Sequence, residues 1–395
     1  MRVLVVIPYY EPAFLYGGPA RSVSTLCRAL VRAGAEVSVF TTDANGSGRL
    51  DVPVGQPVDL GGVRVYYFRR DWRTNFFYSA DLAEACLRRV GEFEVVHCNA
   101  LWTYPSLPTA TACRRSGVPR VESLRGGLMP WCLHHHYWKK WLFLVAVERS
   151  RLNRARAIHC TDELEREAIL RLGVRSPAFI VPNPVELSEF SSLPQRGWLR
   201  ARLGLGPDAA VSLFLGRLSA VKGVDRTISA FASVAARRQN AHFVIAGPDD
   251  DGSGQRGQTL VSRLGLTDRI SFIGTITGAD RLAALADADL FVLTSHSENF
   301  GMAAAEALAA GLPVLLSDQV GIARQVAEAG AGCVVPLDES RIAGAWSSLL
   351  GDRTALSAMG NRGRNLARQE YDADRVARKM LTVYSSVIRD WRAQH

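Results

Sequence analysis

The stretch LFVLTSHSENFGMAAAEALAAGLPVLL at residues 290–316 carries most of the architectural information in this chain. Its opening residues 290–293 are continuously apolar, which favours a buried strand. An alanine-rich segment from about Gly301 to Ala310 favours a helix, and Gly311 is a typical C-terminal stop. A second apolar run follows at once. Continuous apolar strands joined by helices are typical of parallel sheets covered on both faces, so we expect an α/β protein.

The same alternation runs along the whole chain. Amphipathic segments such as Arg21–Ala33 and Thr227–Arg238 separate short β-branched runs. This pattern predicts two Rossmann-like halves. The strands we predict are Val3–Ile7, Val37–Phe40, Val63–Tyr67, Val95–Cys98, Arg120–Ser123, Ala157–Cys160, Phe179–Val181, Val211–Leu215, His242–Ala246, Ile270–Ile273, Leu290–Leu293, Pro313–Leu316 and Cys333–Val335.

One interruption separates the two series of strands. The segment from Pro182-Asn183-Pro184 to Pro194 favours a turn and an extended linker. We therefore place an N-terminal domain at 1–190 and a C-terminal domain at 191–373. The final segment, 374–395, has a helical pattern with no strand after it, and we expect this helix to cross back onto the first domain.

Composition limits the class of protein. A chain of 395 residues suits two domains, and 48% hydrophobic residues is an ordinary globular value. The net charge of +9 fits nucleic acid, a membrane surface or a phosphorylated substrate alike. The seven cysteines have no CxxC spacing and are odd in number, which argues against a zinc site or a disulfide framework. The first apolar run stops at Pro8, too short for a signal peptide, and we expect a cytoplasmic protein.

The strongest chemical signal follows the predicted strand 290–293. Glu298 lies just before the predicted helix, and Glu306 lies one to two turns into it. The free amides of residues 299–302 at such a helix start can bind anions or hydroxyl oxygens. A carboxylate can accept hydrogen bonds from two neighbouring hydroxyls at once. Charge complementarity at a helix start would also explain Glu298, but an unpaired Glu306 in a largely buried helix would be costly unless it served a ligand.

Two further loops carry basic or glycine-rich motifs. After the strand 211–215, Gly216-Arg217 and Lys222-Gly223 place a guanidinium fork and a compact ammonium in one strand-to-helix loop. The two cations suit phosphate oxygens, although either alone is common as an exposed loop residue. After the first strand, Gly17-Gly18 opens a helix and can form a second anion cradle. Neither loop has the GxxxxGK[ST] or GxGxxG spacing of common nucleotide-binding motifs.

The order of these motifs resembles the family-four retaining glycosyltransferases of the GT-B fold. That family shows a glycine-rich first loop, a GR…KG loop and two glutamates separated by seven residues. The resemblance covers nearly the whole chain, including Gly247 after the strand 242–246. It implies two Rossmann-like domains facing across a cleft, with the N-terminal domain binding the acceptor and the C-terminal domain binding the nucleotide sugar.

The resemblance also implies roles for single residues. Arg217 and Lys222 would hold the donor diphosphate and stabilise the leaving group. Glu298 would contact hydroxyls of the donor sugar. The full set of implied donor-binding residues is Gly17, Gly18, Gly216, Gly247, Ile273, Ile276, Asn299, Phe300, Gly301, Met302 and Glu306, with Glu306 on the ribose and Ile273 to Ile276 beside the base.

The N-terminal half departs from the family pattern. Many relatives carry a histidine after the strand 120–123, where this chain has Arg125, and we expect Arg125 to act in catalysis there. Asn99 stands where relatives often show a second histidine, and Asn299 replaces a common glycine. The segment around Arg125 resembles a subgroup acting on bacterial polysaccharides. Acceptor contacts are expected from His97, Asn99 and Trp102.

Three other stretches have residue types that occur in metal sites or on membrane-binding surfaces. Asp249-Asp250-Asp251 is interpreted as a solvated turn, and His134-His135-His136 as a partly exposed helix face. The family implies transfer without a metal or other cofactor. The stretch 131–156 is rich in tryptophan, lysine and arginine. It fits docking on an anionic membrane surface as well as a core helix with a basic outer face.

The resemblance implies a retaining hexosyltransferase that uses a UDP- or GDP-linked sugar. We expect the acceptor to be a glycan or a lipid-linked sugar of bacterial surface polysaccharide synthesis, with contact to the inner membrane, and we expect no nucleic-acid partner. A sugar-nucleotide epimerase or hydrolase of the same fold is the main alternative. A Rossmann oxidoreductase lacks its GxGxxG motif here, and a two-domain exported binding protein lacks a signal peptide.

Overall fold

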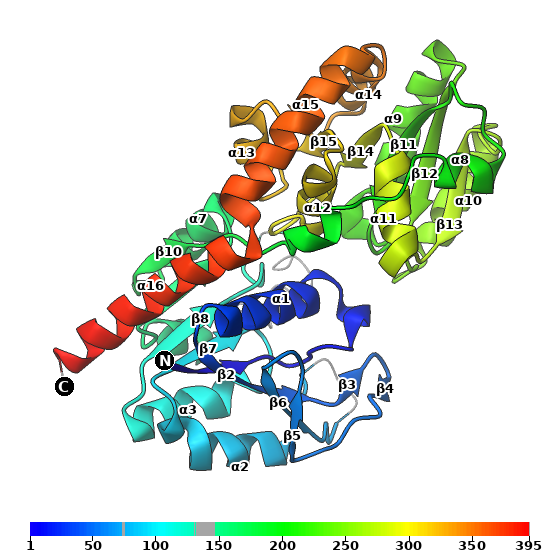
Figure 1. The fold of residues 1–395 in the computed structure, drawn as a ribbon. Coiled ribbons are helices and arrows are strands. Elements are labelled where there is room, and N and C mark those ends of the chain that lie inside the picture. The colour runs from blue at the N-terminus through cyan, green and yellow to red at the C-terminus, as the bar shows by residue number, and fades with distance from the viewer. Residues whose placement is uncertain (73–75, 130, 132–146, 395) are drawn as a thin grey trace. The chain divides into compact units, whose positions relative to one another are not determined.

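The computed structural model describes residues 1–394 except 73–75, 130 and 132–146. The chain forms two compact units (Figure 1). The first contains Met1–Pro184 together with Ala373–His395, and the second contains Val185–Asp372. The chain thus leaves the first unit at Pro184, before the predicted boundary near residue 190, and returns to it at Ala373.

The first unit is built on one sheet with the strand order β10-β9-β8-β7-β1-β2-β6-β5. All neighbouring strands are parallel except β5, which runs antiparallel to β6. The strands are β1 (Arg2–Val6), β2 (Glu36–Thr42), β5 (Pro57–Asp59), β6 (Arg64–Phe68), β7 (Val95–Asn99), β8 (Arg120–Ser123), β9 (Ala157–Cys160) and β10 (Ala178–Ile180), and a separate hairpin pairs β3 (Ala44–Asn45) with β4 (Gly48–Arg49).

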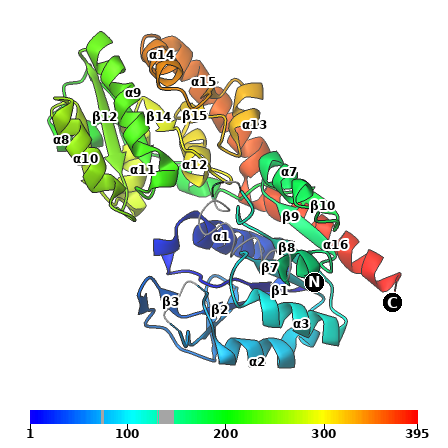
Figure 2. The same cartoon turned by 180° about the vertical axis from the view of Figure 1, so that it is seen from behind.

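Helices cover both faces of this sheet because its central strands are apolar on both sides. In β1, Val3 and Val5 join one hydrophobic cluster, whereas Leu4 and Val6 join another on the opposite face. The second view shows α2 and α3 together on one side of the sheet (Figure 2). The helices are α1 (Gly18–Arg32), α2 (Ala80–Arg89), α3 (Ser106–Ser116), α6 (Arg149–Leu152), α7 (Glu163–Arg171) and α16 (Ala373–Arg392), with short turns η1 (Phe14–Tyr16) and η2 (Val90–Glu92).

The C-terminal helix α16 packs beside α1 on the first unit (Figures 1 and 2). One face of α16 supplies apolar side chains to the cluster that also contains Val3 and Val5. An ion pair of 2.7 Å joins Arg32 at the end of α1 to Asp374 at the start of α16. The expected return of this helix to the first domain is therefore confirmed.

The second unit contains an all-parallel sheet with the order β13-β12-β11-β14-β15-β16. The strands are β11 (Ala210–Leu215), β12 (Ala241–Ala246), β13 (Ile270–Gly274), β14 (Leu290–Leu293), β15 (Val314–Ser317) and β16 (Gly332–Val335). The helices are α8 (Trp198–Leu203), α9 (Val224–Arg237), α10 (Ser253–Arg263), α11 (Gly278–Asp287), α12 (Met302–Ala310), α13 (Ala323–Glu328), α14 (Glu339–Leu349) and α15 (Arg353–Leu366), with turns η4 (Leu187–Phe190), η5 (Ala220–Lys222) and η6 (Ala367–Tyr371).

A single hydrophobic cluster fills the second unit. Trp346 of α14 is fully buried against Phe231 and Phe243, and its indole N–H donates to the hydroxyl of Ser212 at 2.8 Å. This satisfies the polar atom that a buried tryptophan carries into the core. The rigid sheet that results fixes the loops at the carboxyl ends of its strands, where ligands of parallel sheets bind.

The predicted elements agree closely with these bounds. Every strand expected from an apolar run is present, and α12 runs from Met302 to Ala310 with Gly311 as its C-cap residue at a φ of 77°. The prediction missed β3, β4 and β5. These strands have two or three residues each and few buried positions, so they lack the apolar run that marked the others.

Candidate functional site

Three loops of the second unit meet at the carboxyl ends of β11, β12 and β14. The amide of Leu218 donates to Pro248 at 2.8 Å, and the amide of Asp250 donates back to Leu218 at 3.0 Å. The loop after β14 joins them because the amide of His296 donates to Val221 at 2.8 Å. The loops that carry the predicted basic and acidic residues therefore form one hydrogen-bonded surface.

Lys222 and Glu298 contact each other across two of these loops as an ion pair. Both side chains are less than a fifth exposed. Burial, and to a lesser degree the charge of Arg217, lowers the pKa of Lys222 to about 7. The Glu298 carboxylate opposes this shift because it favours the protonated amine. The proximity predicted from their positions after neighbouring strands is thus present in the structure.

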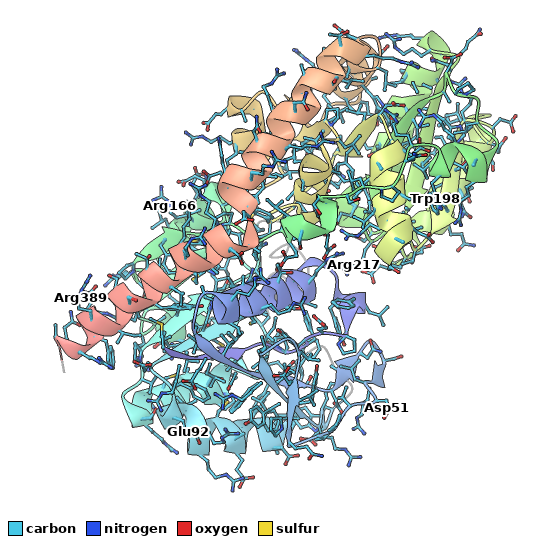
Figure 3. All side chains as sticks on the ribbon, viewed as in Figure 1. Asp51, Glu92, Arg166, Trp198, Arg217 and Arg389 are labelled. Atoms are coloured by element: carbon cyan, nitrogen blue, oxygen red, sulfur yellow. The ribbon has the colours of Figure 1, made fainter. Side chains whose placement is uncertain are left out.

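Arg217 is also engaged by a carboxylate. Its Nη1 lies 2.7 Å from Oδ2 of Asp250, and both side chains are about half exposed. Figure 3 labels Arg217 at the surface of the second unit. An exposed pair of this kind contributes at most about 1 kcal/mol. A phosphate group of a ligand can therefore replace Asp250 as the partner of Arg217 with little loss of free energy.

The start of α12 presents free amides beside Glu298. Gly301 is the N-cap residue with a φ of 96°, and no side chain caps the helix. A Cβ at Gly301 would lie 2.9 Å from Val320, so both the backbone conformation and the space favour glycine. The loop is held in place because the amide of Glu298 donates to Gln319 at 3.0 Å and its carbonyl accepts from Gly321 at 2.9 Å.

Glu306 has a partner that the sequence did not reveal. Its Oε2 lies 2.5 Å from Nη1 of Arg281 in α11, and both side chains are less than a tenth exposed. The expectation of an unpaired buried carboxylate was therefore wrong, since Arg281 compensates the charge. The same arginine pairs with Glu189 of η4, so it links Glu306 to the segment that enters the second unit.

Gly247 explains how closely the first two loops approach. A Cβ at this position would lie 1.7 Å from the carbonyl oxygen of Gly216, and its φ is 148°. Only glycine fits here. Beyond these loops, Ile276 is buried and Ile273 is half-buried at the end of β13. Of the residues assigned to the base, Ile273 lies on β13 and Ile276 lies just after it, and the amide of Gly247 donates to the carbonyl of Gly274 between them at 2.9 Å.

Phe300 differs from the other residues assigned to the donor. Its side chain is 2% exposed and packs edge-on against Tyr371 with ring centroids 5.3 Å apart. Its carbonyl accepts from the amide of Ile322 at 3.2 Å. The ring therefore belongs to the core, and only the backbone N–H of Phe300 is placed to serve a ligand. Asn299 and Met302 beside it are half-buried.

The three aspartates after β12 are used by the protein itself. Asp249 accepts from the amides of Gly254 and Gln255 at 3.0 and 3.1 Å, which lowers its pKa. Asp251 accepts from the amides of Ala220 and Ser253. In the described ranges, no group of three or more His, Cys, Asp or Glu side chains is arranged to hold a metal ion.

In the first unit, Gly17 is the N-cap of α1 with a φ of 79°, and Pro19 occupies the first turn. Uncapped helix amides therefore begin directly at Gly18, as the sequence pattern indicated. Tyr9 and Tyr16 stack nearby with ring centroids 4.1 Å apart.

Arg125 is held by two asparagines at the carboxyl end of the first sheet. Its Nε and Nη2 donate to Oδ1 of Asn99 at 3.1 and 2.9 Å, and its Nη1 donates to Oδ1 of Asn183. Burial lowers its pKa below the ordinary arginine value. Arg125 also has a φ of 50°, which is uncommon for a residue with a side chain. Two hydrogen-bonded partners thus fix the guanidinium in one orientation.

His97 is not available to an acceptor. It is fully buried, its Nδ1 lies 2.7 Å from the Tyr384 hydroxyl, and its Nε2 lies 3.3 Å from Nδ1 of His159. Burial lowers the pKa of His159 to about 3, and its Nε2 donates to the carbonyl of Val181 at 2.8 Å. His159 Nδ1 therefore accepts from His97, and His97 accepts from Tyr384.

Trp102 keeps a partly exposed ring, but its indole N–H donates to Gly127 at 2.8 Å. Trp102 and Ala100, which both follow β7, have φ values of 64° and 76°. Together with Arg125, these residues give three non-glycine positions with a positive φ near the carboxyl edge of the sheet. Such strain gathers at functional sites.

Most of the basic stretch 131–156 lies outside the described residues, including the three consecutive histidines. Of its described part, Arg151 is buried and pairs with Glu122 and Glu148. Arg156 donates to Gln394 and to the Asp390 carbonyl. Within the part of the chain that the structure describes, none of the helices is long and apolar enough to cross a membrane.

Comparison with known proteins places this arrangement in a family. Residues 17–184 match the model of the glycosyl transferase 4-like domain, and residues 197–366 match that of the glycosyl transferases group 1. The chain is 32% identical over 404 residues to D-inositol 3-phosphate glycosyltransferase 2 of Catenulispora acidiphila, covering 89% of this chain and 92% of that one. The chain belongs to the family-four glycosyltransferases. One family model falls in each structural unit.

Other relatives of this glycosyltransferase agree. An uncharacterised glycosyltransferase of Methanocaldococcus jannaschii is 26% identical over 402 residues, covering 97% of this chain and 98% of that one. Anabaena HepE, solved in complex with UDP and glucose, has a TM-score of 0.78 at 21% identity and covers 98% of this chain and 100% of its own. WaaG, described as a glycosyltransferase involved in lipopolysaccharide biosynthesis, has a TM-score of 0.73 at 20% identity and covers 97% and 99%. The predicted GT-B fold is confirmed.

Several residues of the site escaped the sequence analysis. Asp250, Arg281 and Asn183 hold the side chains of Arg217, Glu306 and Arg125. Each comes from a different element and lies far in sequence from its partner. Two of them lie in patterns that the sequence analysis noted: Asn183 in Pro-Asn-Pro, interpreted as a linker, and Asp250 in a run of three aspartates, interpreted as a solvated turn.

Proposed function

We propose that this glycosyltransferase transfers a hexose from a UDP- or GDP-linked donor, with retention of configuration, to a glycan or lipid-linked acceptor of a bacterial surface polysaccharide. The observation that supports it most is the pairing of Lys222 with Glu298 in the loops that also carry Arg217. Two cations and a carboxylate on one surface match a pyrophosphate with a sugar beside it.

The second unit binds the donor in this proposal. Arg217 and Lys222 exchange their carboxylate partners for the diphosphate oxygens and stabilise the negative charge that develops on the departing nucleotide. The carboxylate of Glu298, released from Lys222, accepts hydrogen bonds from donor sugar hydroxyls, and the amides at the start of α12 lie beside it. Glu306, oriented by Arg281, accepts from the ribose. No metal or other cofactor takes part.

The first unit binds the acceptor. Arg125 is oriented by Asn99 and Asn183, and its remaining N–H groups serve the reacting sugar or an acidic group of the acceptor. Gly17 and Gly18 supply backbone amides at the start of α1 to the donor phosphates. The protein works in the cytoplasm, and an acceptor carried by lipid brings it to the inner membrane surface.

The test begins with binding. Calorimetric titrations with UDP, GDP and ADP, and then with UDP-glucose and GDP-mannose, identify the nucleotide. Transfer of labelled sugar to a bacterial lipid extract is then measured, and NMR of the product reads the anomeric configuration. We expect Lys222→Ala and Arg217→Ala to lower transfer by about 10²–10³-fold each. The matched control Arg263→Ala, an exposed arginine at the end of α10, leaves it unchanged.

Two outcomes would contradict the proposal. Near-normal transfer by both Arg217→Ala and Lys222→Ala would remove the diphosphate assignment. Release of free sugar or an altered sugar nucleotide, with no dependence on acceptor, would establish the epimerase or hydrolase alternative. An inverted product would refute retention alone.

A further inference from the structure

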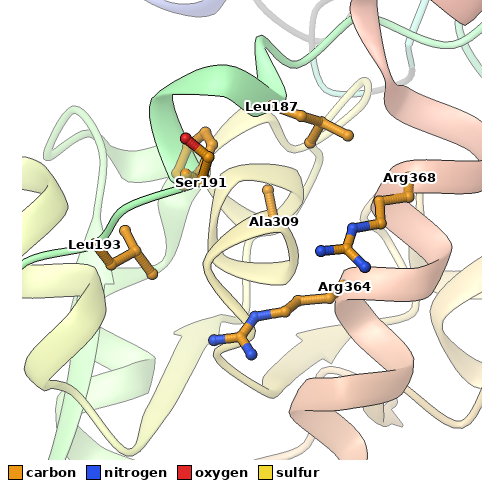
Figure 4. Close-up of a pocket in the computed structure, with 7 residues that line it drawn as sticks. Leu187, Ser191, Leu193, Ala309, Arg364 and Arg368 are labelled. Atoms are coloured by element: carbon orange, nitrogen blue, oxygen red, sulfur yellow. The ribbon is translucent and has the colours of Figure 1, made fainter.

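A pocket of about 310 Å³ lies at the opposite end of α12 from the donor loops. It is formed where η4, the end of α12, the end of α15 and the start of η6 meet, all within the second unit (Figure 4). Since α12 has nine residues, its two ends are about 13 Å apart. The pocket is therefore separate from the loops around Glu298. Its lining residues are Leu187, Phe190, Ser191, Leu193, Ala309, Arg364 and Arg368.

The lining combines two arginines with apolar walls. Arg364 and Arg368, one helical turn apart, reach toward η4 and Ala309 (Figure 4). Arg364 donates to the Ala310 carbonyl at 3.0 Å, whereas Arg368 has no hydrogen bond or ion pair within the described part of the chain. The described lining includes no Asp or Glu. Two like charges one turn apart repel each other, so an anion between them would be stabilising.

A neighbouring pocket of about 680 Å³ shares Arg364 with the smaller one. Two other arginines of the larger pocket, Arg196 and Arg200, pair with Asp287 and Asp289 of its lining. In the described lining of the smaller pocket no carboxylate lies beside Arg368, so Arg368 is the guanidinium that an external anion would meet there.

The pocket is connected to the donor site by direct contacts. Phe190, which lines it, lies under the guanidinium of Arg281 with 5.6 Å between the guanidinium carbon and the ring centroid. Arg281 in turn pairs with Glu306, and Ala309 lies one turn after Glu306 in the same helix. A ligand that fixes η4 against α12 would therefore hold Arg281 on the carboxylate that we assign to the ribose.

We propose that this pocket binds a small soluble phosphate monoester with an apolar body, and that its occupation strengthens donor binding. The double negative charge of a phosphate monoester matches the two guanidinium groups, and Leu187, Phe190 and Leu193 face its apolar part. The volume lies at the lower end of the range for small-molecule sites. The coupling to the donor rests on the proposed role of Glu306, whereas the binding itself does not.

Binding is tested with phenyl phosphate as the probe, by calorimetry and thermal shift, with and without saturating UDP so that the donor loops are filled. Inorganic phosphate, benzoate and benzyl alcohol separate the contributions of charge and ring. We expect phenyl phosphate to bind most tightly and benzyl alcohol not to bind. Arg368→Gln should weaken phenyl phosphate binding about tenfold or more, while Arg263→Gln, the matched loss of one exposed charge, should not.

Ser191→Phe provides a second variant, since it fills the exposed mouth of the pocket and leaves both arginines in place. It should block phenyl phosphate and leave UDP binding intact. Equal binding by wild type, Arg368→Gln and Ser191→Phe would overturn the site. Equal losses in Arg368→Gln and Arg263→Gln would reduce it to general charge attraction, which also overturns it.

The coupling is measured as the UDP dissociation constant with and without saturating phenyl phosphate. We expect about a fivefold decrease, reciprocated in the affinity for phenyl phosphate and absent in Arg368→Gln. Unchanged UDP affinity despite phenyl phosphate binding would refute the coupling and leave the site. If UDP does not bind but GDP does, the coupling is measured with GDP instead. If neither nucleotide binds, the proposed function fails, but the loss of phenyl phosphate binding in Arg368→Gln still decides the site.

Discussion

Whether Glu306 binds the donor ribose or only compensates Arg281 can be decided by comparing three variants. Glu306→Gln removes the charge that Arg281 meets, Arg281→Met removes the guanidinium, and the double variant removes both. Each substitution changes the side-chain volume only slightly, and neither residue belongs to the Lys222–Glu298 pair. The comparison separates the two roles because the double variant has no ion pair left to break.

The stability effect follows from the burial of the pair. The side chains of Arg281 and Glu306 are 5% and 7% exposed, with 2.5 Å between Nη1 and Oε2. Removing one member of a buried pair costs about 3–5 kcal/mol. Arg281 keeps Glu189 and gains a neutral acceptor in Glu306→Gln, so we expect a loss of about 1–3 kcal/mol. The double variant should recover part of this, because it leaves no uncompensated charge at the buried pair.

Donor affinity behaves differently if Glu306 binds the ribose. Hydrogen bonds to a charged acceptor contribute about 1.5–3 kcal/mol. We therefore expect the UDP dissociation constant to rise about 10- to 100-fold in Glu306→Gln. The same loss should persist in the double variant even though its stability returns. Urea denaturation reports the first quantity and calorimetric titration with UDP reports the second.

The result that refutes this reasoning is specific. If the double variant regains wild-type UDP affinity along with its stability, Glu306 acts only as the counter-ion of Arg281. If Glu306→Gln changes neither quantity, the pair is immaterial to both folding and donor binding.

Three further predictions concern the loops around the proposed diphosphate site. Gly247→Ala should destabilise the protein by about 2–4 kcal/mol in urea denaturation, because its Cβ would overlap a carbonyl at 1.7 Å, while Gly344→Ala in an open helix position should not destabilise it. UDP affinity should fall as pH rises above 7, because Lys222 with a pKa of about 7 must then take up a proton to bind phosphate. Lys222→Arg should flatten this pH profile, because arginine stays charged. A flat wild-type profile to pH 9 would mean that the lysine stays charged as well. Asp250→Asn should increase UDP affinity up to about fivefold by releasing Arg217, and a decrease would show that the aspartate positions the arginine.

The fold was largely predictable because its determinants are local. The strand at 290–293 is continuously apolar, the alanines after it favour a helix, and Gly311 ends that helix. Loops after parallel strands converge on one edge, so the positions of Lys222 and Glu298 in such loops were enough to predict that they lie close together. These inferences needed only spacing along the chain.

The partners of the site residues were not predictable in this way. Arg281 reaches Glu306 from a separate helix, and Asn183 reaches Arg125 from the end of the first segment of its unit. A polar side chain in a helix or a turn carries no periodic signal that names its partner. His97 illustrates the reverse error, because its position near the carboxyl end of a strand suggested an acceptor contact, whereas Tyr384 and His159 occupy both ring nitrogens.

The division of the chain has a consequence for fragments of this protein. The second unit is an insertion within the first, and its two ends meet where the amide of Val185 donates to Tyr371 at 2.7 Å. Truncation at residue 372 would therefore spare the second unit and damage the first. The lost helix carries the buried side chains Val376, Ala377, Met380, Tyr384, Val387 and Ile388.

Burying the five larger of these side chains is worth about 8–15 kcal/mol. That equals or exceeds the whole stability of a typical domain. A frameshift or protease cut near the C-terminus would thus unfold the first unit while the second unit persisted, and limited proteolysis would distinguish the two.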